Sequence, residues 1–202
     1  DINGYEKVDP TTQIITIQPE NNEITFYYTK KSDLNYSVHY KEQGTEKTIA
    51  EDKVVGNQVF GNTIEESAID IEGYDKVNPT TAEIEITTGT NEHTFYYTKG
   101  KFNYKVEYYY DNVIDNSKTD IIEATYKDEI TTYTEKPEVG YMFDKVEGTP
   151  LVIAADEDKN VIKVYYVTDP SQTKTLKYTV NYYKDNVLQE NDTQNETQIV
   201  QI

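Results

Sequence analysis

The sequence predicts a mainly β protein, α+β at most, built from tandem copies of a unit of about 70 residues. The pentapeptide FYYTK occurs at residues 26–30 and again at residues 95–99, 69 positions later. In the runs around both copies, apolar and polar residues alternate with the period of a half-buried β-strand. Self-similarity at a fixed spacing is the signature of a repeat architecture. We therefore expect successive copies of one small β unit.

The composition favours small units with thin cores. Only 36% of the 202 residues are hydrophobic, and 20 Tyr with no Trp supply much of the bulk. A tyrosine can bury its ring while its hydroxyl stays in water, so a Tyr-rich chain can build partly hydrated cores. A unit of this size has marginal stability alone, and contacts with neighbouring units can add to it.

The charge and the missing residue types exclude several functions. The chain has 19 Lys and Arg against 37 Asp and Glu, a formal net charge of -18. Nucleic acids and anionic membrane surfaces attract basic proteins, so we expect neither as a partner. Because Cys is absent, the chain has no disulfide, no Cys-ligated zinc and no thiol nucleophile. No run of about 18 apolar residues occurs, so we expect no membrane insertion in this segment, and we expect no cofactor.

The repeat extends well beyond the pentapeptide. Residues 4–30 and 73–99 are identical at 17 of 27 positions without a gap. A third, more divergent copy runs from Gly140 to Tyr166. A second signature, Tyr-x-Val-x-Tyr, recurs out of phase with the first at residues 36–40, 104–108 and 178–182. Tandem duplication explains both series.

Starting each unit at the Tyr-x-Val-x-Tyr signature divides the chain into four pieces. Short polar stretches near the boundaries favour this phase, although a start at the Gly-Tyr pairs would give two full units and a remnant. The chain begins at Asp1 without Met or a signal-like stretch, so we expect a mature protein or an excised fragment. The pieces are the C-terminal half of a repeat (1–31), two complete repeats (32–100 and 101–173) and the N-terminal part of a further repeat (174–202).

Each unit is expected to begin and end with a strand that has one apolar face. In the first strand, Tyr36, Val38 and Tyr40 alternate with polar residues, as their counterparts do in the later copies. In the last strand, the inward residues of the three copies are Ile24, Phe26 and Tyr28, then His93, Phe95 and Tyr97, then Ile162, Val164 and Tyr166.

The segments between these strands carry turn signals. Polar stretches at residues 20–23, 88–91 and 156–160 lie between alternating runs and predict hairpin turns. Residues 58–73 allow a single helical turn or a loop, and Pro137 limits any helix in the other unit to a short one. Each unit is thus expected to contain a hairpin, a crossover with at most one short helix, and two closing strands.

The residues do not predict an enzyme. His39 and His93 are the only side chains that normally titrate near neutrality, and neither recurs between copies. No Ser or Asp is recognisably placed to form a catalytic triad with them. Paired carboxylates can hydrolyse glycosides, but close pairs arise by chance among 37 acidic residues, and a solvated acidic surface is the preferred interpretation. An internal isopeptide crosslink between a Lys and a nearby Asn or acid is an alternative that the sequence leaves open.

The acidic stretch at 156–160 is a weak metal candidate. Asp156, Asp158 and Asn160 occupy positions one, three and five of a calcium-loop pattern. The pattern then fails, because position six is Val161 instead of Gly and position twelve is Val167 instead of Glu. A turn is the preferred interpretation, and we expect no metal.

One tyrosine per copy is expected on the face away from the core. Tyr27, Tyr96 and Tyr165 occupy the same register of the last strand. An exposed aromatic ring can stack on the apolar side of a sugar, so the three are candidate glycan-binding residues. The same rings can pack against a neighbouring strand or unit, which we prefer.

The order of these segments resembles a known family. The chain reads YxVxYY, then a polar β stretch, GYxxDKVEGT, an acidic turn and VxKVYYV, most clearly from Tyr104 to Val167. This resembles the MucBP (mucin-binding protein) repeats of Gram-positive bacterial surface proteins, over nearly the whole chain. The family's usual DxDG after the first strand is replaced at residues 41–44, 110–113 and 183–186, so no ligand residue is carried over from it.

The resemblance implies ubiquitin-like β-grasp units in an elongated array, secreted and attached to the cell wall. The implied role is a stalk or adhesin segment that spaces a binding head from the wall, or that binds host mucin or other glycans weakly and multivalently. An alternative is self-assembly, in which the terminal half units pair with neighbouring repeats or other chains to give a filament or strand-complemented array. A less favoured alternative is an accessory region of a glycan-active enzyme.

Overall fold

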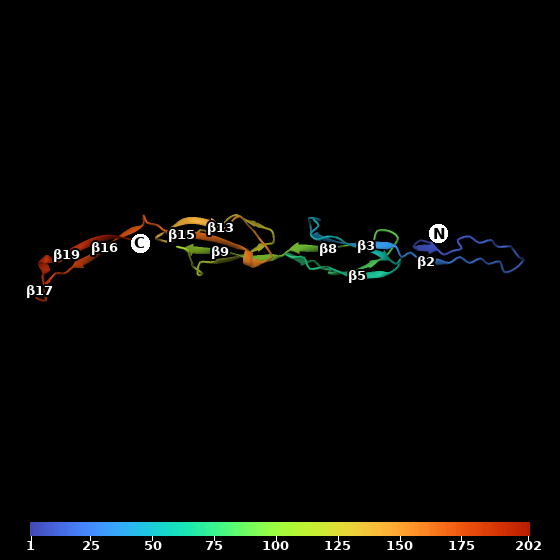
Figure 1. The fold of residues 1–202 in the computed structure, drawn as a ribbon, viewed down its shortest axis with the longest axis horizontal. Coiled ribbons are helices and arrows are strands. Elements are labelled where there is room, and N and C mark those ends of the chain that lie inside the picture. Colours follow the sequence, from blue (N-terminus) through green and yellow to red (C-terminus); the bar gives the residue numbers. More distant parts are fainter. The chain divides into compact units, whose positions relative to one another are not determined.

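The computed structural model describes all 202 residues and is mainly β (Figure 1). Apart from its strands it has two 3-10 helices of three residues each, η1 (Glu157–Lys159) and η2 (Glu190–Asp192). Neither has the length and apolar character that a membrane-crossing helix requires. The chain divides into two compact units, Asp1–Gly100 and Lys101–Ile202, each of which contains one complete repeat.

The first unit contains a four-stranded sheet in the order β4-β3-β8-β6. The central strands β3 and β8 run parallel, and the outer strands pair antiparallel with them. A separate antiparallel pair, β5 with β7, completes the core, because buried residues come from both sheets. The strands are β3 (Leu34–Glu42), β4 (Lys53–Gln58), β5 (Thr63–Ser67), β6 (Tyr74–Lys76), β7 (Thr81–Glu85) and β8 (Glu92–Lys99).

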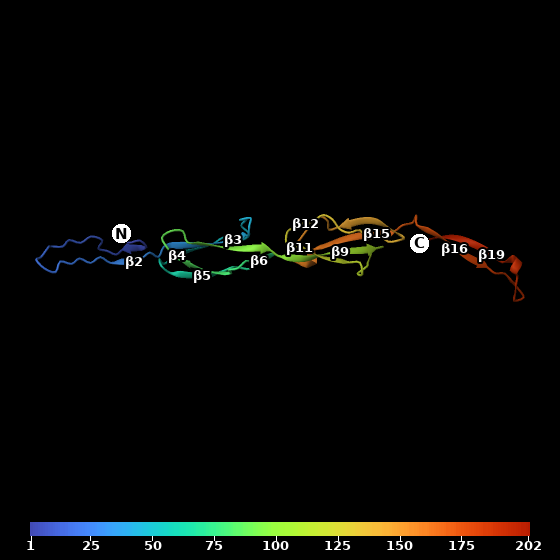
Figure 2. The ribbon, with the colours of Figure 1, turned by 180° about the vertical axis from the view of Figure 1, so that it is seen from behind.

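The second unit repeats this plan (Figure 2). Its parallel pair is β9 with β15, flanked by β13 beside β15 and by β11 and the short β10 beside β9. The separate pair is β12 with β14. The strands are β9 (Lys101–Tyr110), β10 (Val113–Ile114), β11 (Asp120–Thr125), β12 (Glu129–Ile130), β13 (Tyr141–Glu147), β14 (Leu151–Val152) and β15 (Val161–Thr168).

The two parallel pairs have the same register. Val38 lies opposite His93 in the first unit, and Val106 lies opposite Ile162 in the second. The shifts are 68 residues on the first strand (38 to 106) and 69 on the last (93 to 162). Because a slip of one residue would turn every side chain to the other face, equal registers mean that both copies bury the same positions.

The inward faces predicted for the two complete repeats are confirmed, except that His93 is only half-buried. Alternate residues of the parallel strands are buried, and the remaining core comes from the crossover and from the strand before the last turn. The buried residues of the first unit are Tyr36, Val38, Tyr40, Ala68, Ile84, Ile86, Phe95 and Tyr97. Those of the second are Tyr104, Val106, Tyr108, Tyr110, Leu151, Ile153, Ile162, Val164 and Tyr166.

A glycine stands at the start of the C-terminal half of each repeat and makes the same backbone hydrogen bond in all three copies. Gly4, Gly73 and Gly140 all have positive φ angles, of 79°, 79° and 91°. Their carbonyls accept hydrogen bonds from the backbone N–H groups of residues 31, 100 and 169, at 3.0, 2.9 and 2.7 Å. The left-handed conformation costs glycine little, which explains why the same residue stands before the Tyr in each copy.

Two expectations about the connections are wrong. The stretch 58–73 contains strand β5 instead of a helical turn, because its alternating residues pair with β7. The turns at 88–91 and 156–160 do not close hairpins. Each joins two strands of different sheets, β7 to β8 and β14 to β15, since the last strand pairs in parallel with the first strand of its unit.

The two end segments contain only some of the strand pairs found in the complete units. Residues 1–31 contain β1 (Tyr5–Lys7) and β2 (Tyr28–Lys30), paired antiparallel, and no strand between them. The expected inward face of this copy is therefore not buried, because no first strand lies beside it. The C-terminal segment contains two antiparallel pairs, β16 (Thr173–Val180) with β19 (Gln194–Gln201) and β17 (Tyr183–Lys184) with β18 (Val187–Leu188).

Candidate functional site

The three candidate tyrosines occupy different surroundings. Tyr96 and Tyr165 lie half-buried on the outer faces of β8 and β15. Tyr27 is 69% exposed in the segment that forms no strand. The Tyr96 hydroxyl donates to Glu46 at 3.5 Å, a long contact that holds the ring weakly. Of the three, only Tyr27 is exposed.

The Tyr165 ring makes stacking and cation–π contacts with its neighbours. Its ring lies 4.9 Å from that of Tyr109 on the adjacent strand, with an interplanar angle of 22°. Lys145 lies over Tyr165 at 4.7 Å, and Lys163 lies 6.0 Å from the centre of the Tyr109 ring. A hydrogen bond to Glu107, together with desolvation, raises the pKa of Tyr109 to about 12. Cation–π and stacking contacts on both sides favour the packing interpretation of Tyr165 over an open sugar platform.

The structure places a Ser and an Asp beside His39, contrary to the expectation from sequence. Ser37 Oγ lies 3.3 Å from His39 Nε2, and Asp52 Oδ2 lies 2.8 Å from Nδ1. Ser37 and His39 share the outer face of β3 because they are two residues apart on one strand. Asp52 reaches them through the strand pair β3 with β4, which sequence spacing does not reveal. A depression of about 430 Å³ includes Ser37 and His39.

This order of contacts matches that of a catalytic triad, but its surroundings differ from those of a hydrolase. The backbone N–H of Ser37 donates to the Asn91 carbonyl at 2.9 Å, so it is not free to stabilise an oxyanion. The equivalent positions of the second copy hold Lys105, Glu107 and Thr119. The cluster is therefore a surface feature of one copy and carries no repeated chemistry.

Buried asparagines hold the turn before the last strand in both complete units. Asn160 is fully buried; its Oδ1 accepts from the Ala154 N–H at 2.9 Å, and its amide donates to the carbonyls of Ala154 and Asn103 at 2.9 and 3.2 Å. Asn91 makes the matching contacts to Thr87 and to the Asn35 carbonyl. Each asparagine thus ties the turn to the start of the unit's first strand.

The asparagine signal was visible in the sequence. Asn22, Asn91 and Asn160 are spaced by 69 and 69 residues, each just before the alternating run of the last strand. Because Asn is common in turns, its presence at these positions predicts a turn and does not by itself indicate a buried side chain.

The weak calcium candidate is built as a capped turn. Asn160 points into the protein and uses its oxygen on the backbone, so its side chain is not turned toward the two aspartates. Asp156 caps η1 by accepting from the Asp158 N–H at 3.2 Å and pairs with Lys159 at 3.2 Å. No group of three or more His, Cys, Asp or Glu side chains is arranged to hold a metal ion.

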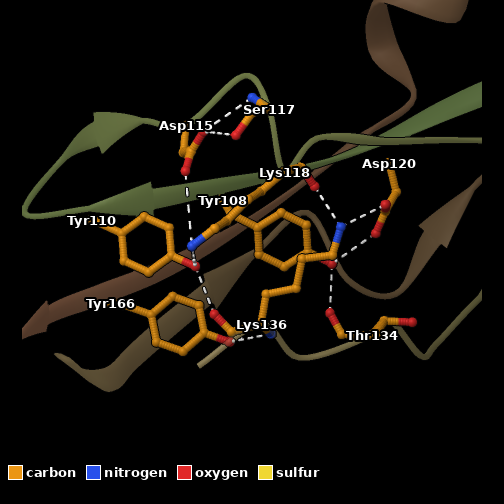
Figure 3. Close-up of polar contacts among 9 residues, drawn as sticks. All are labelled: Tyr108, Tyr110, Asp115, Ser117, Lys118, Asp120, Thr134, Lys136 and Tyr166. Carbon is orange, nitrogen blue, oxygen red and sulfur yellow. Dashed lines mark hydrogen bonds and ion pairs between the residues drawn. The ribbon is translucent and has the colours of Figure 1, made fainter. Parts of the chain in front are cut away.

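Core tyrosines fix the crossover of the second unit (Figure 3). Tyr108 and Tyr110 donate to the carbonyls of Thr134 and Lys136 at 2.5 and 2.6 Å, and the Lys136 N–H donates to the Tyr166 hydroxyl at 2.9 Å. Desolvation, with the hydrogen bond to a nearby aspartate, raises the pKa of Tyr108. These hydroxyls satisfy the backbone of a segment that forms no strand, which explains why the thin core is built from tyrosine.

Each complete unit contains a lysine–carboxylate ion pair that starts from the strand beside its first strand. In the first unit Lys53 on β4 pairs with Glu66 on β5 at 2.7 Å. In the second, Asp120 holds the position of Lys53 and pairs with Lys136 at 2.6 Å. One position thus carries a basic side chain in the first copy and an acidic one in the second. The partner comes from a different place, strand β5 in the first unit and a segment without a strand in the second.

The pair in the first unit is an ordinary ion pair. Desolvation opposes ionisation of Glu66, but hydrogen bonds from Lys53 and Tyr36 outweigh it and lower the pKa of the carboxyl. The hydrogen bond to Glu66 raises the pKa of Lys53. A protonated amine is not a nucleophile, so this geometry favours an ion pair over an isopeptide crosslink.

Two comparisons with known proteins find no match. A scan against protein-family models finds no match, and a search of curated proteins finds no relative. The class of the protein is thus given by its fold alone, a mainly β chain with two copies of one unit.

Proposed function

We propose that the chain is a load-bearing segment of a stalk or adhesin on a bacterial cell surface, made of MucBP-like, β-grasp-like repeats. The observation that carries this proposal is the place of the first and last strands in each complete unit. β3 pairs with β8, and β9 with β15, in parallel over six residue pairs each. The chain enters a unit on one of these strands and leaves it on the other.

Parallel terminal strands resist tension. The start of β3 and the end of β8 lie at opposite ends of the parallel pair, so a pull on the chain slides one strand along the other. All hydrogen bonds of the ladder are then loaded together, whereas a pull on adjacent strand ends opens them one by one. Forced unfolding depends on the barrier to unfolding, so this geometry raises the force that a unit withstands.

The residues that recur between the copies also support a spacer function. The residues that recur are the buried Tyr and Val of the first strand, the Asn before the last strand and the Gly that closes the back half. The outward-facing, half-buried residues on the first strand differ, with Ser37 and His39 in one copy and Lys105 and Glu107 in the other. A conserved core with a variable surface is what we expect of a spacer, whose function depends on its length and not on a repeated binding site.

The cell-surface location follows the resemblance to MucBP repeats and the net charge of -18, which keeps an array of units soluble and apart. Secretion, attachment to the wall and an elongated arrangement of units belong to this proposal. A spacer role explains the tandem repeats, because the length of a spacer increases with the number of identical units.

The load-bearing role is tested by pulling one unit in two directions. Because the chain has no Cys, engineered cysteines give unique handles. Handles at Asp33→Cys and Lys99→Cys load β3 against β8 in shear. Handles at Asp33→Cys and Gln58→Cys load the antiparallel pair β3 with β4 from adjacent ends, where Leu34 lies opposite Gln58. We expect the shear handles to need at least about twofold more force in single-molecule experiments. Equal forces, or a weaker response in shear, would contradict the proposal.

Weak adhesion to mucin or other glycans is a second candidate, favoured by the exposure of Tyr27 and by the half-buried position of Tyr96, whose hydroxyl makes only a long contact to Glu46. We expect Tyr96→Ala to lower glycan-array binding of the chain about threefold or more if the ring stacks on sugar. Tyr165→Ala serves as the matched control, because its ring is already enclosed. Absence of binding to any mucin or glycan would leave the spacer role alone.

A further inference from the structure

Two tyrosines on the first and last strands of the second unit stack on one another. Tyr109 on β9 and Tyr165 on β15 are directly opposite in the parallel pair. Their ring centres are 4.9 Å apart, and the ring planes differ by 22°. Both side chains are half-buried on the outer face of the sheet, so neither ring is sealed from solvent.

Each of these two hydroxyls donates a hydrogen bond to a carboxylate of its own. The Tyr109 hydroxyl donates to Glu107 Oε2 at 2.7 Å, and the Tyr165 hydroxyl donates to Glu147 Oε2 at 3.1 Å. Hydrogen bonds from Lys145 and Tyr165 lower the pKa of the Glu147 carboxyl, so this group is ionised at neutral pH. A carboxylate at hydrogen-bond distance is placed to take the phenolic proton.

A phenol with a base beside it is prepared for one-electron oxidation. Loss of an electron makes the phenol strongly acidic, so its proton leaves with the electron and passes to the carboxylate. The product is a neutral phenoxyl radical. Because the ring gains no charge, Lys145, which lies over Tyr165 at 4.7 Å, does not oppose the step. The unpaired electron is shared between the oxygen and the ortho and para carbons, and two such rings couple through their ortho carbons.

Neighbouring and equivalent positions do not combine these features. Tyr110 and Tyr166 also stack, at 5.2 Å and 12°, but both rings are buried. Their hydroxyls bond to the backbone of Lys136, which cannot take up a proton. In the first unit, Lys41 lies opposite Tyr96, so the outward tyrosine of that copy has no tyrosine across from it. The first unit is therefore an internal control for any chemistry at the outward pair of the second.

We propose that Tyr109 and Tyr165 form an oxidative crosslinking site, at which a haem peroxidase with hydrogen peroxide joins the two strands as a dityrosine. Each phenol loses one electron and one proton, and Glu107 and Glu147 accept the protons. One carbon–carbon bond forms between the ortho positions, and each ortho hydrogen is then transferred as a proton to restore a hydroxyl. The two electrons and two protons reduce one hydrogen peroxide to two molecules of water.

The crosslink would join the first strand of the unit to its last. It closes a loop that contains residues 110–164, which lowers the entropy of the unfolded chain and so stabilises the unit. A pull on the ends of β9 and β15 could then no longer slide one strand past the other, because the covalent bond carries the load. The chemistry at the site does not depend on the proposed stalk function, although a stalk would gain from it.

The site is tested by oxidising the chain at low micromolar concentration with a purified haem peroxidase and hydrogen peroxide. The monomer is isolated by gel filtration, digested and analysed by mass spectrometry. We expect a linked peptide pair that contains Tyr109 and Tyr165 and lacks two hydrogen atoms. Tyr109→Phe and Tyr165→Phe are each expected to abolish this species. Phenylalanine keeps the ring, and the Met142 methyl signal reports that the unit stays folded. Tyr96→Phe, at the equivalent position of the first unit, is expected to leave the yield unchanged.

A second substitution tests the carboxylate as proton acceptor. Glu107→Gln keeps an oxygen that can accept the hydrogen bond from Tyr109 but removes the base, so the crosslinking rate is expected to fall about tenfold or more. Glu46→Gln, beside Tyr96 in the first unit, is the matched control and is expected to leave the rate unchanged. Absence of dityrosine from the monomer, or a crosslink that survives Tyr109→Phe, would overturn the proposal. Equal rates with Glu107→Gln and the unsubstituted chain would overturn the role assigned to the carboxylate.

Discussion

Phe95→Ala is expected to lower the free energy of unfolding of the first complete unit by about 3–5 kcal/mol. The ring is 1% exposed and lies opposite Tyr40 in the parallel pair, with the His93 ring 4.6 Å away. Its removal leaves a cavity in the small core between the two sheets of the unit. Because a unit of this size has marginal stability, this loss approaches the whole of it.

The matched control is the same change at Phe26, in the copy that has no first strand. Phe26 is 40% exposed, so Phe26→Ala is expected to cost less than about 1 kcal/mol. Phe95→Leu, which keeps an apolar side chain, is expected to cost about 1.5 kcal/mol or less and keeps the unit measurable if the alanine variant unfolds.

The sequence provides a separate reporter for each unit. Both histidines, His39 and His93, lie in the first unit, and the single methionine, Met142, lies in the second. Urea unfolding followed by proton NMR can therefore use the imidazole signals for the first unit and the methionine methyl for the second. Equal costs at Phe95 and Phe26, or a change confined to the Met142 signal, would contradict the burial described here.

Asn160→Ala is expected to lower the stability of the second unit by about 3 kcal/mol. The change removes three part-buried hydrogen bonds, to the Ala154 N–H and to the carbonyls of Ala154 and Asn103, and leaves a cavity where the fully buried Asn160 side chain stood. The turn that joins β14 to β15 then loses its tie to the start of β9. Unpaired buried backbone groups cost more than the bonds themselves contribute.

The measurement is the same urea titration, with Met142 as the reporter. The His39 and His93 signals are expected to keep their midpoint, because the substitution lies in the other unit. Asn22→Ala is the control, since Asn22 occupies the same position in the exposed half and makes only the local pair of bonds. A loss below about 0.5 kcal/mol at Asn160 would show that the asparagine is a turn residue and no more.

The sequence predicts the parts of the fold that depend on periodicity. Alternation identified the buried faces of Tyr36, Val38 and Tyr40 and of Tyr104, Val106 and Tyr108, and the 69-residue spacing identified the copies, whereas Tyr178 and Tyr182 are exposed. Periodicity does not show which strand lies beside which. The turns at 88–91 and 156–160 were therefore expected to close hairpins, although the strands that they join belong to different sheets.

The site residues show the same limit. Ser37 and His39 lie on one face of one strand, which spacing predicts, but Asp52 reaches them only through the β3–β4 pairing. Glu66 is buried at 8% exposure, against the usual tendency of carboxylates, because Lys53 and Tyr36 satisfy it from other strands. Partners supplied by tertiary structure decide such positions, and a single sequence does not contain them in readable form.

The most direct test of the repeat organisation is hydrogen exchange of the unsubstituted chain, followed by mass spectrometry at low micromolar concentration. A closing strand should be protected only where its own first strand lies beside it. Peptides covering residues 92–97 and 161–166 are expected to exchange slowly, and a peptide covering residues 23–27 to exchange as fast as an unstructured segment. Strong protection of residues 23–27 in the monomer, or fast exchange in either complete unit, would contradict the account.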